Sequence, residues 1–129
     1  MTERELSWRI WLDHGDKYLK AAIPKGKIGI LGPTIRYNLL SISMENYIMA
    51  ILDFYKTLPD NHTYTDLITS LEQVVPVDEG LKSRILKHEC VQSICSMSDY
   101  HRNDPSEDDL VDLTGAITEI GQMAHRICA

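Results

Sequence analysis

Prolines and one glycine-rich stretch divide this chain into five segments, and within each segment the apolar residues recur about every three or four positions. That spacing places them on one face of an α-helix. No segment shows the strict alternation of apolar and polar residues that is typical of a strand. Since the connections are short, consecutive helices are expected to run antiparallel. The sequence therefore predicts an all-α, up-and-down helical bundle of about five helices, four of which form the core.

The expected helices begin at residues that can cap a helix N-terminus. A Ser, Thr or Asp side chain accepts a hydrogen bond from the first backbone N–H groups, which predicts N-caps at Thr34, Thr63, Asp78 and Ser106. Thr63 and Asp66 have the spacing of a capping box. The acids that follow Ser106 suit the positive end of the helix dipole. The predicted helices cover residues 3–23, 34–58, a short stretch from 63, 78–100 and 106–128.

Two of these helices carry further expectations. The second is predicted to be central and heavily buried, on the apolar residues Ile35, Leu39, Ile42, Tyr47, Ile51, Phe54 and Leu58. The last combines an apolar stripe with four small residues, Gly115, Ala116, Gly121 and Ala124. Small residues let a neighbouring helix approach closely, and four are more than one interior helix needs. A homodimer is therefore expected.

Length and composition set the class of protein. A chain of 129 residues fits one domain, 1–129, and buries a core without disulfides or metal. No apolar run approaches the ~20 residues of a membrane span, and the acidic start lacks the apolar core of a signal peptide. Three cysteines without a Cys-x-x-Cys pair favour free thiols in a reducing cytoplasm.

The net charge of −6 is unevenly distributed. Residues 1–40 hold seven Lys or Arg against four acids, whereas residues 41–129 hold six against fifteen. General DNA binding is not expected, because most of the chain would repel a phosphate backbone. The first third offers a possible anion patch at Lys25, Lys27 and Arg36; the alternative is a solvated helix face and loop. The nearby Gly-Lys-Ile-Gly-Ile-Leu-Gly-Pro stretch is not a phosphate loop, because its lysine lies at the wrong end.

The chain contains histidines, acids and cysteines, which are the residues that bind metals or act as nucleophiles. Their spacing in the sequence is not the spacing that a metal site or a covalent catalyst needs. The chain contains no Glu-x-x-His pair of the kind that holds two irons in helical bundles. Each of the five histidines is interpreted as a surface or capping residue. Cys95 and His101 lie about a turn and a half apart on a helix, with Cys95 on the apolar side. No catalytic residue, metal or cofactor is therefore expected.

Tyr100, His101 and Arg102 stand together at the expected end of the fourth helix. Basic side chains there suit the negative end of the helix dipole and its free carbonyl groups. The same three residues could stack on a nucleotide and pair with its phosphate. Both interpretations stay open.

The region of residues 35–128 resembles the HEPN family of small helical domains, named for nucleotide binding in prokaryotes and higher eukaryotes. Members have a helix of small and apolar residues with an embedded glutamate, similar to Ser41 through Leu52 with Glu45. A loop histidine before a short helix with Asp-Leu follows, matched by His62 and Asp66-Leu67. A cluster of Tyr, Arg and Pro ends the next helix, matched by Tyr100, Arg102 and Pro105.

The chain departs from the ribonucleases of that family. Their motif is an Arg, four to six residues and then a His; Arg84 and His88 are one residue short of it. Arg9 and His14 have the spacing but lie in the first helix, and Asp104 stands where a second aromatic is usual. The resemblance thus implies the non-catalytic branch, which binds a nucleotide or a partner protein such as a minimal nucleotidyltransferase.

Three functions are therefore considered. The first is a non-enzymatic HEPN-like module whose ligand contacts Tyr100, His101, Arg102 and His62. The second is a metal-independent ribonuclease using Arg84 and His88, or Arg102 and His101. The third is a structural bundle for protein association. In an alternating bundle, residues 24–33 and the end of the last helix share one end, and His62 and residues 100–102 share the other, where the specific contact is expected.

Overall fold

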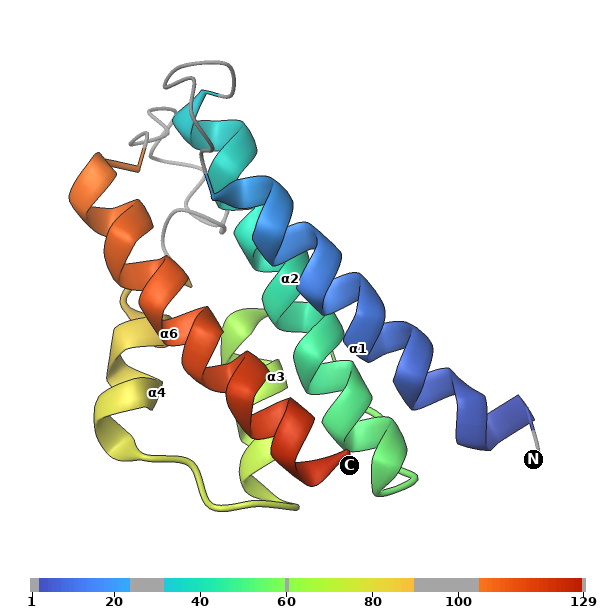
Figure 1. Ribbon diagram of the computed structural model, residues 1–129. Helices are drawn as coiled ribbons and strands as arrows, with labels where there is room; N and C mark the ends of the chain where they lie inside the picture. Colours follow the sequence, from blue (N-terminus) through green and yellow to red (C-terminus); the bar gives the residue numbers. More distant parts are fainter. Residues whose placement is uncertain (1–2, 24–31, 60, 90–104, 129) are drawn as a thin grey trace.

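The computed structural model describes residues 3–23, 32–59, 61–89 and 105–128 (Figure 1). These residues form five α-helices and no strand, so the predicted all-α bundle is confirmed. None of the described helices is long and apolar enough to cross a membrane. The helices are α1 (Glu3–Ala22), α2 (Pro33–Phe54), α3 (Tyr64–Glu72), α4 (Glu79–Leu86) and α6 (Glu107–Ile127).

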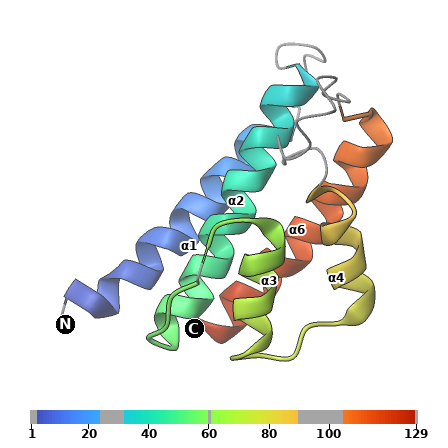
Figure 2. The same cartoon turned by 180° about the vertical axis from the view of Figure 1, so that it is seen from behind.

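The long helix α2 lies at the centre of the bundle, between α1, α3 and α6 (Figures 1 and 2). Helix α1 packs antiparallel on it, as expected for a short connection. Helix α6 runs parallel to α2, because Arg36 near the start of α2 pairs with Glu107 at the start of α6, and Ala50 near the end of α2 meets Cys128. Helix α4 packs against α6 and α3.

This direction of α6 differs from strict alternation, so the expected grouping of helix ends is wrong. The end of α6 lies at the end of the bundle opposite to the start of α2 (Figure 1). The cause is α3, which begins beside residues 41–45 in the middle of α2 and runs in the same direction as α2 (Figure 2). Because α3 does not reverse direction relative to α2, α6 runs opposite to the direction that strict alternation predicts for it.

Three of the four predicted N-caps are confirmed. The side chains of Thr63, Asp78 and Ser106 each accept a hydrogen bond from the backbone N–H three residues later, at 3.0–3.1 Å. Ser106 and Asp109 form a complete capping box, since Asp109 Oδ2 also accepts from the Ser106 N–H at 3.1 Å. This contact, followed by the Ser106 hydroxyl, lowers the pKa of Asp109. Each such cap stabilises its helix by about 1 kcal/mol.

The second helix starts close to the predicted position, but its N-cap and its end differ from the prediction. Helix α2 starts at Pro33 behind Gly32 as its N-cap, because proline has no N–H to leave unsatisfied at a first position. It ends at Phe54 rather than Leu58. Lys56 has a φ of 60°, and the N–H groups of Lys56 and Thr57 donate back to the carbonyls of Asp53 and Leu52. These are the two bonds of a Schellman motif, which stops the helix.

The fourth helix that the structure describes is shorter than the predicted helix over residues 78–100. Helix α4 ends at Leu86, with Lys87 as its C-cap, instead of continuing to Tyr100. Residues 90–104, with most of the expected apolar stripe of that helix, lie outside the described residues.

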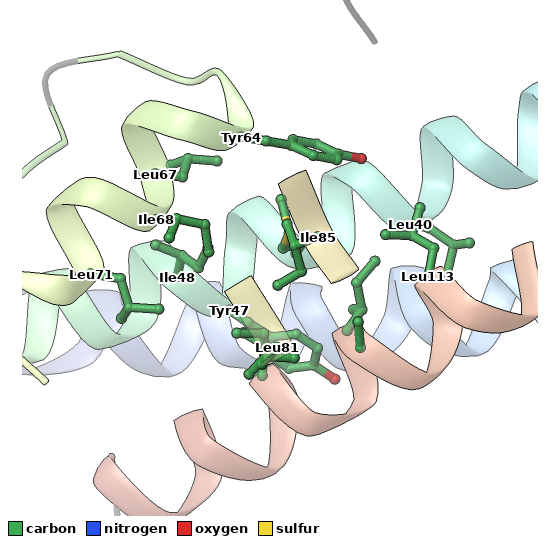
Figure 3. Close-up of a cluster of buried hydrophobic side chains, with 14 of the residues drawn as sticks. Leu40, Tyr47, Ile48, Tyr64, Leu67, Ile68, Leu71, Leu81, Ile85 and Leu113 are labelled. Carbon is green, nitrogen blue, oxygen red and sulfur yellow. The ribbon is translucent and has the colours of Figure 1, made fainter. Parts of the chain in front are cut away.

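The core forms where α2, α3, α4 and α6 meet (Figure 3). The face of α2 that packs into it differs from the predicted stripe, because Ile35, Ile42, Phe54 and Leu58 are exposed, Leu58 by 73%. Each buried leucine or isoleucine contributes about 1.5–3 kcal/mol relative to an exposed one. The buried face of α2 includes Tyr37, Leu40, Met44, Tyr47, Ile48 and Ile51.

The small residues of α6 are used within the chain. A Cβ at Gly121 would lie 2.8 Å from the ring of Tyr47 in α2, and one at Gly115 would lie 3.0 Å from the guanidinium of Arg84 in α4. Ala116 and Ala124 are fully buried. Because neighbouring helices of the same chain fill this space, the small residues no longer argue for a homodimer, which stays a prediction.

Candidate functional site

A cavity of about 340 Å³, partly open to solvent, lies between α2 and the start of α3; we call it the α2–α3 pocket. Four of its lining residues recur along one face of α2 at helical spacing, and the others come from residues 62–67. The lining residues are Asn38, Ser41, Ile42, Glu45, His62, Tyr64 and Leu67. The pocket therefore combines polar side chains with the apolar surface of Ile42 and Leu67.

The pair of Glu45 and His62 joins α2 to the loop that precedes α3. His62 Nδ1 contacts Glu45 Oε1, although the two residues are 17 positions apart in the sequence. The His62 side chain is 62% exposed and that of Glu45 35%, so the contact lies where the pocket meets solvent. A ligand that enters the pocket would meet this carboxylate and this imidazole.

The inner part of the pocket is formed by Tyr64, which is fully buried. Its hydroxyl shares a hydrogen bond with Ser41, and its ring stacks on Tyr37 at a centroid distance of 6.4 Å. Burial, followed by the neighbouring Tyr37 and then Glu89, raises the pKa of Tyr64. The phenol thus keeps its proton at neutral pH and serves as a hydrogen-bond group rather than as a base.

Further carboxylates lie beside the pocket at the start of α3. Glu89 accepts two hydrogen bonds from Thr65, from the backbone N–H at 3.1 Å and from the hydroxyl at 2.6 Å. Asp66 accepts from the Thr63 hydroxyl at 2.8 Å. Among the described lining residues there is no lysine or arginine. The surroundings of the pocket therefore carry negative charge.

A second polar cluster joins α4 to α6. His88 Nε2 donates to Asp112 Oδ2 at 2.8 Å, Lys87 Nζ lies 2.9 Å from the same oxygen, and Arg84 Nε lies 3.3 Å from Oδ1. The hydrogen bond from His88, and then the contacts of Lys87 and Arg84, lower the pKa of Asp112 to about 2. Asp112 is thus held as a carboxylate at the centre of this cluster.

His88 corrects the interpretation of all five histidines as surface or capping residues. Its side chain is only 4% exposed, and the Tyr37 hydroxyl donates to its backbone carbonyl at 2.7 Å. The cluster ties α4 to α6, and this arrangement does not present His88 to a substrate. Arg84, the other residue of the shortened motif, also pairs with Glu119 at 3.2 Å.

A third polar group, the Tyr47 seam, consists of Tyr47, Asp16, His125 and the two glycines Gly15 and Gly121. The Tyr47 hydroxyl donates to Asp16 Oδ1 at 2.6 Å, and His125 Nε2 lies 2.8 Å from the same oxygen. A Cβ at Gly15 would lie 2.6 Å from the Tyr47 ring, and one at Gly121 would lie 2.8 Å from it. Burial, followed by Asp16, raises the pKa of Tyr47. This group holds α1, α2 and α6 together.

Of the residues predicted to bind a ligand, His62 lies in the α2–α3 pocket. Tyr100, His101 and Arg102 lie outside the described residues, and so do Lys25 and Lys27 of the predicted anion patch. The third member of that patch, Arg36, donates to Glu107 Oε1 at 2.7 Å and to the Ala22 carbonyl at 3.3 Å. Its side chain is 12% exposed and is paired with Glu107, so it offers little free surface to an anion.

The described residues offer little to metal or thiol chemistry. Within them, no three His, Cys, Asp or Glu side chains gather in a way that could hold a metal ion. Cys128 is buried, and burial together with the charge of Asp53 raises the pKa of its thiol to about 11. A thiol that stays protonated is a poor nucleophile.

The sequence did not indicate Asn38, Ser41 and Tyr64 as site residues. A weak signal was present in α2, where Asn38, Ser41 and Glu45 recur at spacings of three and four along a mainly apolar helix. A polar stripe on a buried helix faces either solvent or a cavity. Tyr64 gave no such signal, because a tyrosine that follows an N-cap can pack in a core as readily as it can line a binding site.

Comparisons of the chain with models of protein families, with curated proteins and with solved structures find no match. The HEPN resemblance therefore stays a prediction, and the function is inferred from the site itself.

Proposed function

We propose that this chain is a non-enzymatic binding module whose ligand occupies the α2–α3 pocket. The observation that carries the proposal is the pocket itself. Its volume of about 340 Å³ falls in the ~300–1,000 Å³ range of small-ligand sites. Apolar surface from Ile42 and Leu67 lies beside hydrogen-bonding groups from both helices, which is the composition of such sites.

A binding role fits the hydrogen bonds of the pocket better than catalysis does. Covalent catalysis needs a hydroxyl or thiol bonded to a base. Among the described lining residues, the Ser41 hydroxyl is bonded to Tyr64, and His62 is paired with Glu45. No nucleophile is thus activated by the histidine. A ribonuclease using Arg84 and His88 would need both to reach RNA, whereas both are bonded to Asp112.

The other expectations from the sequence stay predictions. A ribonuclease site at His101 and Arg102 concerns residues outside those that the structure describes. A nucleotidyltransferase partner, a homodimer and a cytoplasmic location rest on the sequence alone. Of the parts of a nucleotide, the base suits the α2–α3 pocket better than the phosphate does, because Glu45 would repel a phosphate.

The test is a nuclear magnetic resonance titration of the ¹⁵N-labelled full chain. The ligand panel consists of adenosine, adenosine monophosphate, n-butylamine, 1-butanol and butyrate. At least one of these is expected to shift the amide signals of residues 38–45 and 62–67. The variant Asn38→Trp places a large side chain at the exposed mouth of the pocket and should weaken that binding at least tenfold.

The control is Gln122→Trp, which adds the same side chain at an exposed position of α6. It should leave binding unchanged. If no ligand of the panel shifts the pocket signals, or if both variants bind as the parent chain does, the proposed function is wrong.

A further inference from the structure

The charge of the α2–α3 pocket indicates which ligand it takes. Glu45 supplies a carboxylate at the mouth whose side chain is 35% exposed, and its partner His62 is the only basic side chain among the described lining residues. Asn38, Ser41 and Tyr64 add oxygen atoms that can accept hydrogen bonds. A positively charged donor would find several acceptors in this space, whereas an anion would find a carboxylate.

The walls of the pocket indicate what the charged group is attached to. Ile42, which is 37% exposed on α2, and Leu67, which is buried on α3, both line the pocket. An aliphatic stem of a few carbons can pack between these two side chains while its charged end reaches Glu45. Burial of such a stem is favourable, because it removes apolar surface from water.

We propose that the α2–α3 pocket binds an alkylammonium group, with the ammonium paired to the carboxylate of Glu45 and the alkyl stem between Ile42 and Leu67. This inference rests on the proposed function and names the ligand class of that site. The ammonium takes the position of His62 beside Glu45. The exposed side chain of His62 then turns toward solvent, where it loses little, because contacts at this exposure are weak.

Charge outside the pocket supports the same ligand class. Glu89 and Asp66 lie on either side of Thr65, next to Tyr64 of the pocket. The chain as a whole carries a net charge of −6. Such a field attracts cations and repels anions over a distance of about 10 Å at ordinary ionic strength.

The experiment compares three probes of the same length by amide-signal titration of the full chain. They are n-butylamine, which is a cation at pH 7.5, the neutral 1-butanol and the anion butyrate. We expect n-butylamine to shift the pocket signals and to bind at least fivefold more tightly than 1-butanol, with butyrate weakest.

Two variants test the role of Glu45. Glu45→Gln keeps the shape and removes the charge, and should reduce the preference for n-butylamine over 1-butanol to less than twofold. Its control is Glu72→Gln, because Glu72 is also paired with a cation, Lys82, and has a side-chain exposure of 30% against 35% for Glu45. Glu72 does not line the pocket, so this variant should keep the preference.

A variant that adds a positive charge at the mouth keeps the inference testable if Glu45→Gln folds poorly. Asn38 is exposed at the mouth, so Asn38→Lys should fold, and its added positive charge should reduce the preference for n-butylamine over butyrate at least fivefold. His62→Gln removes the competing partner of Glu45 and should tighten n-butylamine binding about twofold. Unchanged probe preferences in Asn38→Lys would overturn the inference.

The source of the alkylammonium group is distinguished by a second pair of probes. Nα-acetyl-lysine N-methylamide represents a lysine side chain of a partner protein, and n-butylamine represents a free small amine. Tighter binding of the lysine derivative assigns the site to a partner, and tighter binding of n-butylamine assigns it to a metabolite.

Failure of this inference is distinct from failure of the proposed function. If adenosine, 1-butanol or butyrate binds in the pocket as tightly as n-butylamine, the site is a binding site but not for a cation. If no probe shifts the pocket signals, both proposals are wrong.

Discussion

The Tyr47 seam and the α2–α3 pocket each contain a tyrosine, a carboxylate and a histidine, but in two different arrangements. In the seam, a tyrosine, an aspartate and a histidine are bonded to one another, with Tyr47 Oη 2.6 Å and His125 Nε2 2.8 Å from Asp16 Oδ1. In the pocket, Tyr64 is bonded to Ser41 instead, and a cavity of about 340 Å³ remains beside it.

The difference comes from how closely the helices approach. Gly15 and Gly121 have no Cβ, so α1 and α6 both reach the ring of Tyr47 and leave no space around it. On the other side of α2, the facing element is the start of the short helix α3, with Ile42 and Asn38 exposed on α2. A closed arrangement of these side chains contributes to stability, and an open one is able to bind a ligand.

The largest expected difference in the free energy of unfolding is between a substitution at Tyr47 in the seam and one at His62 in the pocket. Tyr47→Ala removes a buried ring and its hydrogen bond, and should lower the free energy of unfolding by about 3–5 kcal/mol. His62→Ala in the pocket should lower it by less than about 0.5 kcal/mol, because that side chain is 62% exposed. Urea unfolding followed by circular dichroism measures both, and similar losses would remove the distinction between the regions.

Acid should remove the stabilising contribution of Asp112, which lies at the centre of the cluster between α4 and α6. The folded-state pKa of Asp112 is lowered to about 2, so its contribution is complete above pH ~4 and is lost as the pH falls toward 2. We expect a loss of at most about 2 kcal/mol over that interval. In Asp112→Asn the stability difference from the parent chain should shrink as the pH falls.

The control for acid is Gln122→Ala, which changes an exposed, uncharged side chain of the same helix. Its stability difference from the parent chain should stay nearly constant between pH 4 and 2, because it removes no titrating group. A constant difference for Asp112→Asn as well would contradict the role of its contacts with His88, Lys87 and Arg84.

Close approach in the seam is tested by a matched pair of glycine substitutions. Gly15→Ala forces a Cβ to within 2.6 Å of the Tyr47 ring, which is fixed on its other side by Gly121. We expect a net loss of about 1–2 kcal/mol, after the higher helix propensity of alanine is included. Gly115→Ala meets only the flexible end of Arg84 and should be neutral or stabilising by up to about 1 kcal/mol. Thermal unfolding compares the two.

The smallest expected difference in the free energy of unfolding is between substitutions of Asp16 in the seam and Glu45 in the pocket. Asp16→Asn weakens the bonds to Tyr47 and His125 and should lower the free energy of unfolding by about 1 kcal/mol. Glu45→Gln should change it by less than about 0.5 kcal/mol, because its contact with His62 is exposed. A larger effect of Glu45→Gln would mean that the pair of Glu45 and His62 stabilises the fold rather than forming a binding site.

Local features of the helices were largely predictable from the sequence. The caps at Thr63, Asp78 and Ser106 depend on a side chain and an N–H group three residues later, so they need no knowledge of the fold. The end of α2 was not predictable in this way. Lys56 occupies a left-handed position that glycine usually marks, and a lysine gives no such signal.

The candidate site was predictable only in part. His62 was expected to contact a ligand, and Glu45 was noted in the same family resemblance, but nothing in the sequence places them in contact. Their meeting depends on α3 beginning beside the middle of α2. The stripe predicted for α2 also failed at Ile35, Ile42 and Leu58, because an almost uniformly apolar helix does not indicate which face meets the core.

The sequence by itself determined that this chain is a bundle of helices and where most of them start, because apolar periodicity and capping act within a few residues of the chain. The tertiary structure decided the direction of α6, the buried face of α2 and the contrast between a closed seam and an open pocket. Those properties depend on contacts between residues far apart in the sequence, such as Gly15 with Tyr47 and Glu45 with His62. Whether such side chains close on one another or leave a cavity is set by the distance between their helices.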